Sequence, residues 1–251
     1  MTELTGKTAL VVGASKGLGR GIALAFDKAG APVIAVARDA SALAELSAAG
    51  TGIRVEAADA ADEKTAGELI GRYDPDILVL VAGAVPLGLP LQEHTWETFS
   101  IHWDADVKIA FGWLKAALLA PLRPGSRVVV VSSGAGLFGS PASGGYAGAK
   151  ATQRFIAGYA AEESQRAGLG ITVTAVLPSM TPFGAVGRSG IESYSARSGK
   201  TEDEFRQGMG DVLTPEVAGS AVVELVLRDP GSLAPSYLLG AGGLRDVPTP
   251  A

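Results

Sequence analysis

Apolar residues in this chain fall into two kinds of segment that alternate along its length. Short runs rich in Val, Ile, Leu and Ala, bounded by Gly, Pro or charged residues, are typical of buried β-strands. We expect about seven such strands, at residues 8–12, 32–37, 53–57, 76–82, 127–132, 171–177 and 236–239. Their alternation with helical stretches predicts one α/β domain over residues 1–251, a doubly wound parallel sheet flanked by helices on both faces.

The stretches between the strands show the three- to four-residue period of amphipathic helices. The first places Leu18, Ile22 and Phe26 on one face. Another starts at Thr214, where a hydroxyl N-cap is followed by Pro215 and an acidic residue. We expect the remaining helices at residues 41–48, from about 62, at about 95–120 and at 146 to about 166.

Residues 179–212 lack a clean period and are rich in Gly, Ser and charged residues. Segments of this kind often form mobile lids over binding sites, so we expect this one to act as a substrate lid. The apolar contacts expected from it and from the segment after residue 133 are Met180, Phe183, Val186, Ile191, Tyr194, Leu137 and Phe138.

Composition and charge exclude several classes of protein. With 47% hydrophobic and 19% charged residues, the chain is not of the disordered kind. Its net charge of −5 argues against a nucleic-acid or anionic-membrane partner. Cysteine is absent and only His94 and His102 supply imidazoles, so we expect no disulfide, thiol nucleophile or metal site. The chain start lacks a secretory-signal pattern and no apolar run is long enough for a membrane span, which predicts a cytoplasmic protein.

A glycine-rich turn follows the first expected strand and precedes the first helix. It reads Gly13, Ala14, Ser15, Lys16, Gly17, Leu18 and Gly19. The three glycines permit a tight turn and let a pyrophosphate approach the backbone at the helix N-terminus, whose free N–H groups favour anions. Between a strand and a helix, such a turn predicts the dinucleotide site of a Rossmann fold.

The end of the second strand bears on which dinucleotide is bound. This point meets the adenosine ribose in a dinucleotide fold, and an acid there would bind the 2′-hydroxyl of NAD. Here the strand ends in Ala37 and Arg38, and Lys16 lies in the glycine-rich turn. Two cations without an acid at position 37 favour a 2′-phosphate and therefore NADP(H), unless both are merely solvated surface charges. Asp59 could accept from the adenine amine or cap the helix that begins near Asp62.

Candidate chemistry centres on Tyr146 and Lys150, which are four residues apart. On a helix these positions share one face, so the phenol and the ammonium would project side by side. A nearby cation stabilises a phenolate, which would bring the tyrosine pKa toward the range of a working proton donor or acceptor. Ser133, just after the apolar run 127–132, has a hydroxyl that could face the same space.

In their order, the glycine-rich turn, Ser133 and the pair Tyr146 and Lys150 resemble the short-chain dehydrogenase/reductase family, from Lys7 to about Gly243. The resemblance implies that Tyr146 is the general acid for carbonyl reduction and the base in the reverse direction. It further implies that Lys150 lowers the tyrosine pKa and binds the nicotinamide ribose, while Ser133 polarises the substrate carbonyl. Both Tyr146 and Lys150 would therefore also contact the cofactor.

The chain departs from the family pattern at two places. Residues 80–83 read Leu-Val-Ala-Gly where the family has Asn-Asn-Ala-Gly, so Ala82 and Gly83 keep the backbone approach to the cofactor while two amide side chains are lost. Asp106 stands where the family has an asparagine in a proton relay. An aspartate can accept the same hydrogen bonds, but its charge would pair with Lys150 and weaken the pull of the lysine on the tyrosine.

Together these features predict an NADPH-dependent reductase of a ketone or aldehyde, or an alcohol dehydrogenase in reverse. Pro178 matches the family's proline after the sixth strand, and Thr181 is the expected contact for the nicotinamide amide. Few cations other than Arg188 and Arg197 flank the expected pocket, which favours an apolar substrate over a highly anionic one. The alternatives are imine reduction, epimerisation or dehydration on the same residues, or a low-activity NADP-binding regulatory or assembly protein.

A second copy of the chain is the expected protein partner. Members of the family often pair through the long helix and the helix that carries the tyrosine and lysine. Small residues there would allow close approach, namely Ala116, Ala117, Ala120, Ala157, Ala160 and Ala161. We expect a homodimer or homotetramer, with His94, Trp96 and His102 at the surface or in that contact and Trp103 and Trp113 between helices.

Overall fold

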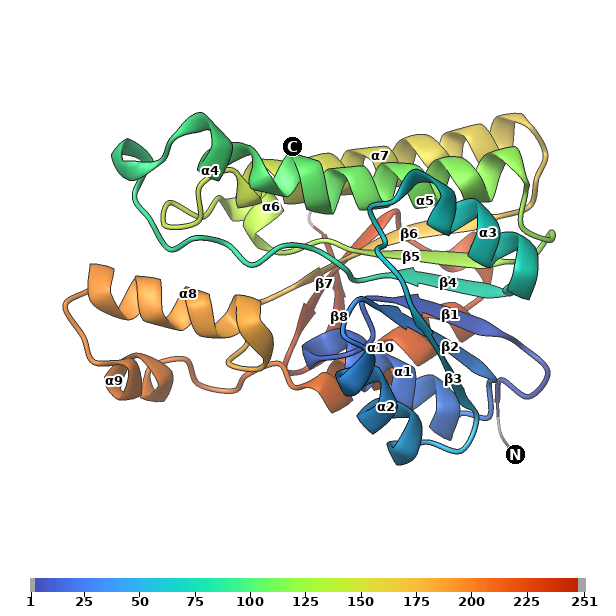
Figure 1. Ribbon diagram of the computed structural model, residues 1–251, viewed down its shortest axis with the longest axis horizontal. Helices are drawn as coiled ribbons and strands as arrows, with labels where there is room; N and C mark the ends of the chain where they lie inside the picture. The colour runs from blue at the N-terminus through green and yellow to red at the C-terminus, as the bar shows by residue number, and fades with distance from the viewer. Residues whose placement is uncertain (1–2, 248–251) are drawn as a thin grey trace.

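One β-sheet organises the computed structural model, which describes residues 3–247 (Figure 1). Its order is β3-β2-β1-β4-β5-β6-β7-β8, with β8 antiparallel to β7 and the other pairs parallel. The order reverses between β1 and β4, and in such sheets the reversal opens a crevice at the carboxyl ends of the strands. The strands are Ala9–Val12 (β1), Val33–Ala37 (β2), Ile53–Ala57 (β3), Ile77–Leu80 (β4), Arg127–Val131 (β5), Thr172–Pro178 (β6), Ser236–Gly240 (β7) and Gly243–Asp246 (β8).

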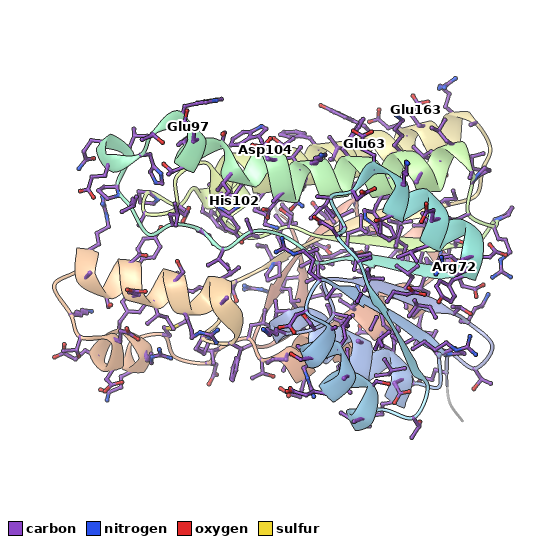
Figure 2. The ribbon with its side chains drawn as sticks, in the orientation of Figure 1. Glu63, Arg72, Glu97, His102, Asp104 and Glu163 are labelled. Carbon is purple, nitrogen blue, oxygen red and sulfur yellow. The ribbon has the colours of Figure 1, made fainter. Side chains whose placement is uncertain are left out.

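Helices cover both faces of this sheet, as the sequence pattern predicts (Figure 1). Their charged positions face outward, as Glu63, Arg72 and Glu163 show (Figure 2). One face carries α1 (Gly17–Lys28), α2 (Ala40–Ala49) and α10 (Pro215–Leu227), and the other carries α3 (Glu63–Tyr73), α5 (Lys108–Leu119) and α7 (Tyr146–Arg166).

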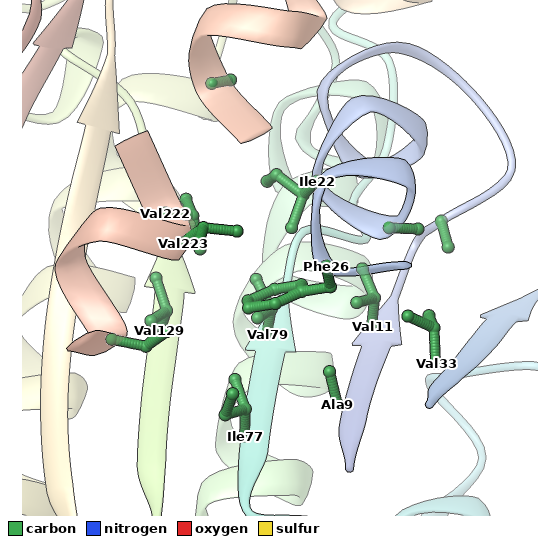
Figure 3. Close-up of a cluster of buried hydrophobic side chains, with 14 of the residues drawn as sticks. Ala9, Val11, Ile22, Phe26, Val33, Ile77, Val79, Val129, Val222 and Val223 are labelled. Atoms are coloured by element: carbon green, nitrogen blue, oxygen red, sulfur yellow. The ribbon is translucent and has the colours of Figure 1, made fainter. Parts of the chain in front are cut away.

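Apolar side chains fill the layers between the sheet and the helices. On one side, Ile22 and Phe26 of α1 pack with Val79 and Val129 of the central strands and with Val222 of α10 (Figure 3). Because successive strand residues point to opposite faces and both faces are covered, β1 and β4 are apolar throughout, and β5 is apolar after Arg127. The burial of each such side chain stabilises the fold by on the order of 1.5–3 kcal/mol. This packing holds the strands in place, and their carboxyl ends carry the site.

The long helix expected at 95–120 is divided into three parts. α4 (Trp96–His102) passes into a π-helical turn, η2 (Trp103–Val107), before α5 begins. A π-helical turn contains an extra residue, so it changes which residues face inward, and the apolar period does not reveal it. Asp106, in this turn, is completely buried.

Other short elements lie around the carboxyl ends of the strands. Two helices occupy much of the segment expected as a lid, and they project beyond the sheet (Figure 1). Gly and Ser throughout the first of them dilute its apolar period, which hid it from the sequence pattern. The elements are η1 (Leu91–Glu93), α6 (Ala135–Phe138), α8 (Gly184–Arg197), α9 (Glu202–Gln207) and η3 (Pro230–Ser232).

The eighth strand and the alanine-rich helix faces differ from the expectations. β8 has only four residues, two of them charged, and it forms because it pairs with β7 at the edge of the sheet. Ala117 of α5 and Ala157 and Ala160 of α7 are buried in the core of their own chain. The close approach that these three side chains allow is therefore used within the chain.

Candidate active site

A cavity of about 1390 Å³ lies at the carboxyl ends of the strands. Its walls come from the turns after β1, β2, β4, β5 and β6, and from α7 and α8. Every site residue named from the sequence lines it: Gly13, Ser15, Lys16, Gly17, Leu18, Gly19, Arg38, Asp59, Ala82, Gly83, Asp106, Ser133, Tyr146, Lys150, Pro178 and Thr181.

The glycine-rich turn brings its backbone against the start of α1. Gly13 has a φ of +93°, and a Cβ on Gly19 would lie 2.0 Å from the Gly13 carbonyl oxygen, so a side chain fits at neither position. α1 begins at Gly17, and no side chain caps it. Its first N–H groups are therefore available to an anion at the cavity wall, which fits the pyrophosphate of a dinucleotide.

An acid lies beside the two cations at the end of β2. Asp39 Oδ2 pairs with Lys16 Nζ at 2.7 Å, and Asp39 Oδ1 accepts from Ser41 Oγ and from the Ala42 N–H at the start of α2. The Lys16 contact, followed by the Ala42 and Ser41 hydrogen bonds, holds the pKa of Asp39 well below its usual value. Arg38 is exposed at the same end of the cavity.

Asp59 and Asp62 occupy distinct positions after β3. Asp62 caps α3 by accepting from the Lys64 N–H at 2.8 Å, so the interpretation of Asp59 as that N-cap is wrong. Asp59 accepts from the Ala61 N–H and lines the cavity.

Tyr146 and Lys150 lie one turn apart at the start of α7, and both are buried. The lysine ammonium is 5.6 Å from the centroid of the tyrosine ring. Ser133 follows β5, and its Oγ accepts from the Ala135 N–H at 3.2 Å. Since all three line one cavity, the hydroxyls and the ammonium that the sequence named belong to a single site.

Lys150 directs its ammonium into the protein wall. Its Nζ pairs with Asp106 Oδ1 at 3.0 Å and donates to Gln153 Oε1 at 2.9 Å and to the Val131 carbonyl at 3.5 Å. Burial would lower the pKa of Lys150, but the interactions with Asp106 and Tyr146 outweigh it and raise the pKa above its usual value.

Asp106 is the centre of the buried polar contacts. Its Oδ2 accepts from His102 Nδ1 and from the Ala84 N–H, both at 2.9 Å. Burial raises the pKa of this carboxyl, but the Lys150 charge and the two hydrogen bonds outweigh burial and lower the pKa to about 2. The backbone carbonyl of Asp106 accepts a hydrogen bond from Gln153 Nε2 at 2.7 Å.

Comparisons with known proteins show the family of the chain. A model of the family described as short chain dehydrogenase matches residues 7–189. The chain belongs to the short-chain dehydrogenase family. Oxidoreductase UcpA of Salmonella typhimurium is 35% identical to this short-chain dehydrogenase over 192 residues, which cover 71% of this chain and 70% of that protein.

Other relatives match shorter stretches. L-xylulose reductase of Mesocricetus auratus is 34% identical over 42% of this chain and 43% of its own length, and 2-keto-3-deoxy-L-fuconate dehydrogenase of Xanthomonas campestris is 40% identical over 41% and 36%. The chain thus matches less than half the length of these two relatives. A crystal structure of a short chain dehydrogenase from Mycobacterium avium superposes with a TM-score of 0.77 at 25% identity, covering 99% of this chain and 87% of that one.

His102 is the residue of this short-chain dehydrogenase that sequence reasoning misplaced. It was expected at the surface or in a subunit contact, yet it is buried, whereas its near neighbour Asp104 is exposed (Figure 2). Its ring meets the Tyr146 ring edge-on, with centroids 5.1 Å apart. The signal was its position four residues before Asp106, and Gln153, three residues after Lys150, carried the same kind of signal.

The outer wall of the cavity contains most of the expected apolar contacts. Met180, Phe183, Val186, Tyr194 and Phe138 line the cavity. Ile191 and Leu137 are not among its lining residues, and Ile191 is completely buried. Arg188 and Arg197 also lie outside the lining, and Arg245 of β8 is a lining cation that the sequence pattern did not indicate.

Side-chain hydrogen bonds tie the expected lid to neighbouring segments. Ser189 Oγ of α8 donates to the carbonyl of Pro86, another residue of the cavity wall, at 2.7 Å. The Tyr194 hydroxyl of α8 forms a hydrogen bond with Ser140 Oγ at 2.8 Å, and Thr181 Oγ1 donates to the Leu213 carbonyl at 2.6 Å.

Within residues 3–247, no helix is long and apolar enough to cross a membrane, and no group of three acidic or histidine side chains is arranged to hold a metal ion.

Proposed function

We propose that this short-chain dehydrogenase is an NADPH-dependent oxidoreductase that reduces a ketone or aldehyde to an alcohol, or catalyses the reverse reaction. The observation that carries the proposal is the shared cavity of Ser133, Tyr146, Lys150 and the glycine-rich turn. The turn can receive a dinucleotide pyrophosphate, and the hydroxyls of Ser133 and Tyr146 can receive a carbonyl oxygen.

Each polar group would have a distinct task. When bound, a reduced nicotinamide supplies the hydride. The Tyr146 hydroxyl donates a proton to the carbonyl oxygen, and in the reverse direction the phenolate accepts it. Ser133 donates a hydrogen bond to the same oxygen as negative charge develops there. Lys150, behind the tyrosine, provides the positive charge that stabilises the phenolate after the proton has left.

The preference for NADP(H) rests on Lys16 and Arg38. Both line the end of the cavity nearest β2, where the ribose 2′ position of a dinucleotide lies in such folds. A 2′-phosphate there would draw Lys16 away from Asp39. The names of two relatives, an L-xylulose reductase and a 2-keto-3-deoxy-L-fuconate dehydrogenase, support carbonyl and alcohol chemistry without fixing the substrate.

We further propose that residues 179–212 form a lid over the substrate and that the substrate has considerable apolar surface. The side chains of Met180, Phe183, Val186 and Phe138 line the cavity and are exposed. An apolar substrate would cover them, and α8 would close over it. Arg245 provides one cation for a polar or anionic group at the far side.

A carbonyl panel tests the proposal, with the loss of NADPH followed by absorbance and NADH run in parallel. The Tyr146→Phe variant should turn over at least about 100-fold more slowly, since general acid–base catalysis contributes roughly 10²–10⁴-fold. Its affinity for NADPH should stay within about threefold of the wild-type value. Tyr73→Phe, which removes a hydroxyl bonded to Glu56 on the outside of α3, is the matched control.

A low-activity NADP-binding protein is the competing function. The ion pair between Lys150 and Asp106 favours it, because this contact holds the ammonium in the wall. Retained NADPH binding with equal, negligible turnover in wild type and Tyr146→Phe would establish the competing function and contradict the reductase. Imine reduction, epimerisation and dehydration use the same residues, and the same panel extended to those substrates separates them from carbonyl reduction.

A further inference from the structure

A buried carboxylate faces the lysine ammonium directly behind Tyr146. Asp106 and Lys150 are both almost completely buried, and their charged atoms are 3.0 Å apart. At this separation and burial, the negative charge of the one largely cancels the positive charge of the other at distances beyond the pair. The neutral amide that stands here in the family pattern would leave the positive charge of the lysine uncompensated.

Asp106 is held in this position by groups on three sides. His102 and the Ala84 N–H both donate to Oδ2, and the Lys150 ammonium contacts Oδ1. Because a carboxylate only accepts, the proton of the histidine contact lies on Nδ1. His102 Nε2 has no hydrogen-bond partner among residues 3–247. Gly83 leaves the space for the carboxylate, since a Cβ there would be 2.4 Å from Oδ1.

The ionisable groups that surround Tyr146 are few. His102 comes from α4, Asp106 from the π-helical turn and Lys150 from α7 itself. On the open side the cavity wall contributes the hydroxyls of Ser133 after β5 and Tyr194 of α8, and its charged lining residues include Asp104 of the π-helical turn and Arg245 of β8. The charge balance at the phenol therefore depends mainly on Asp106 and Lys150.

We propose that Asp106, anchored by His102, is a positioning residue that neutralises Lys150 and so keeps Tyr146 protonated to a higher pH than an amide at position 106 would. This inference rests on the proposed function, and it adds the direction of the reaction. A protonated tyrosine is the form that donates to a carbonyl oxygen, whereas alcohol oxidation needs the phenolate. Compared with a site that has an amide at position 106, this one favours carbonyl reduction over a wider pH range and needs more alkaline conditions for alcohol oxidation.

Direct titration of Tyr146 tests the inference without any substrate. Ring-labelled tyrosine signals are followed by NMR against pH in the cofactor-free protein, and Tyr146→Phe identifies the signal. In Asp106→Asn the midpoint of the Tyr146 titration should fall by about one pH unit, because an uncompensated charge within several ångströms has an effect of this size at an effective dielectric constant near 20. Asp104→Asn removes the same charge from an exposed residue of the same cavity wall, where solvent screens it, and should shift the midpoint by no more than about 0.3 unit.

A second variant keeps the test decisive if Asp106→Asn does not fold. Gly83→Ala inserts a methyl group against Oδ1, which pushes the carboxylate from the ammonium, so the midpoint should move in the same direction. Equal midpoints in wild type and Asp106→Asn, or in wild type and Gly83→Ala where only the latter folds, would overturn the inference.

Activity provides a separate readout of the same inference. The alkaline limb of the carbonyl reduction rate should move down by the same interval in Asp106→Asn, and alcohol oxidation should rise at lower pH. If no carbonyl is reduced by any form of the protein, the proposed function fails, while the NMR shift still decides whether Asp106 controls the ionisation of Tyr146.

Discussion

At the scale of single residues, Asp39 has two opposing effects on the cofactor site. Its carboxylate caps α2 and pairs with Lys16, so it orders the end of β2. The same negative charge would repel a 2′-phosphate placed beside Lys16 and Arg38. Position 37 carries no acid, which favours NADP(H), but Asp39 two residues later places a negative charge at the same end of the strand.

Replacing Asp39 with Asn should therefore tighten the binding of the phosphorylated nucleotide. Asn remains a good N-cap, so the start of α2 should be kept while Lys16 is released. We expect an approximately three- to tenfold gain in affinity for 2′,5′-ADP by calorimetry, and little change for 5′-AMP. Equal changes for both nucleotides, or none for either, would show that Asp39 does not act on the 2′-phosphate.

Residue spacing revealed part of the site and concealed another part. Ser133, Tyr146 and Lys150 were found because their order and spacing are specific, and all three line the cavity. Asp106 was found by position, but the burial of His102 beside it was not. The sequence around His102 is typical of a surface helix. The π-helical turn that follows His102 and the packing of its ring against Tyr146 show that the side chain lies in the interior.

At the scale of elements, α1 and α10 cross at very close range. A Cβ on Gly219 of α10 would lie 2.5 Å from the Gly21 carbonyl oxygen of α1 and 2.7 Å from the Ala25 Cβ. The contact is therefore backbone against backbone, which only a glycine on each helix permits. Because α1 carries the glycine-rich turn at its N-terminus, the crossing also sets the position of the cofactor site.

Gly219→Ala should destabilise the protein by about 1–2 kcal/mol. Overpacking of a tight contact costs roughly 1–3 kcal/mol, and the better helix propensity of alanine recovers about 1 kcal/mol of it at most. Urea unfolding should show a lower midpoint with an unchanged slope. Gly67→Ala, at an exposed site of α3 with no atom within 4 Å of the new methyl, should instead be neutral or stabilising. Equal effects of the two substitutions would contradict the backbone contact.

The pattern of apolar positions was sufficient for the order and type of most elements. Buried parallel strands are apolar throughout, and Gly, Pro and N-cap residues mark the ends of α1 and α10, so their signals are strong. The signals of α8 and β8 are weak because one is rich in Gly and Ser and the other is a charged edge strand. The π-helical turn has no pattern of its own, since its extra residue changes which side chains face inward without any marker residue in the sequence.

At the scale of the whole molecule, α5 and α7 present large apolar side chains to solvent. Phe111 of α5 is 56% exposed, and Phe155 and Tyr159 of α7 are 53% and 58% exposed. These side chains project away from the buried alanines of the same helices. We propose that a second copy of the chain covers them in a homodimer or homotetramer, in place of the alanine-mediated contact expected from the sequence.

Light scattering at micromolar concentration should accordingly give a mass two or four times that of the chain. Phe155→Glu would place a charge in the proposed contact and should reduce the mass, because an unpaired charge is costly to bury. Val55→Glu, at an exposed apolar position of the edge strand β3, is the matched control and should leave the mass unchanged. A strictly monomeric wild-type protein would contradict the proposal.

The three tryptophans are distributed so that the protein carries its own optical probes. Trp113 is completely buried in the core and its indole N–H donates to the Ala60 carbonyl. Its fluorescence emission maximum should therefore be blue-shifted and should not change until the chain unfolds. Trp96 is 72% exposed, and Trp103 stacks on Phe99 against the start of α7. Their emission should be redder and easily quenched. Selective quenching would therefore report events around α4 separately from global unfolding, with no attached dye.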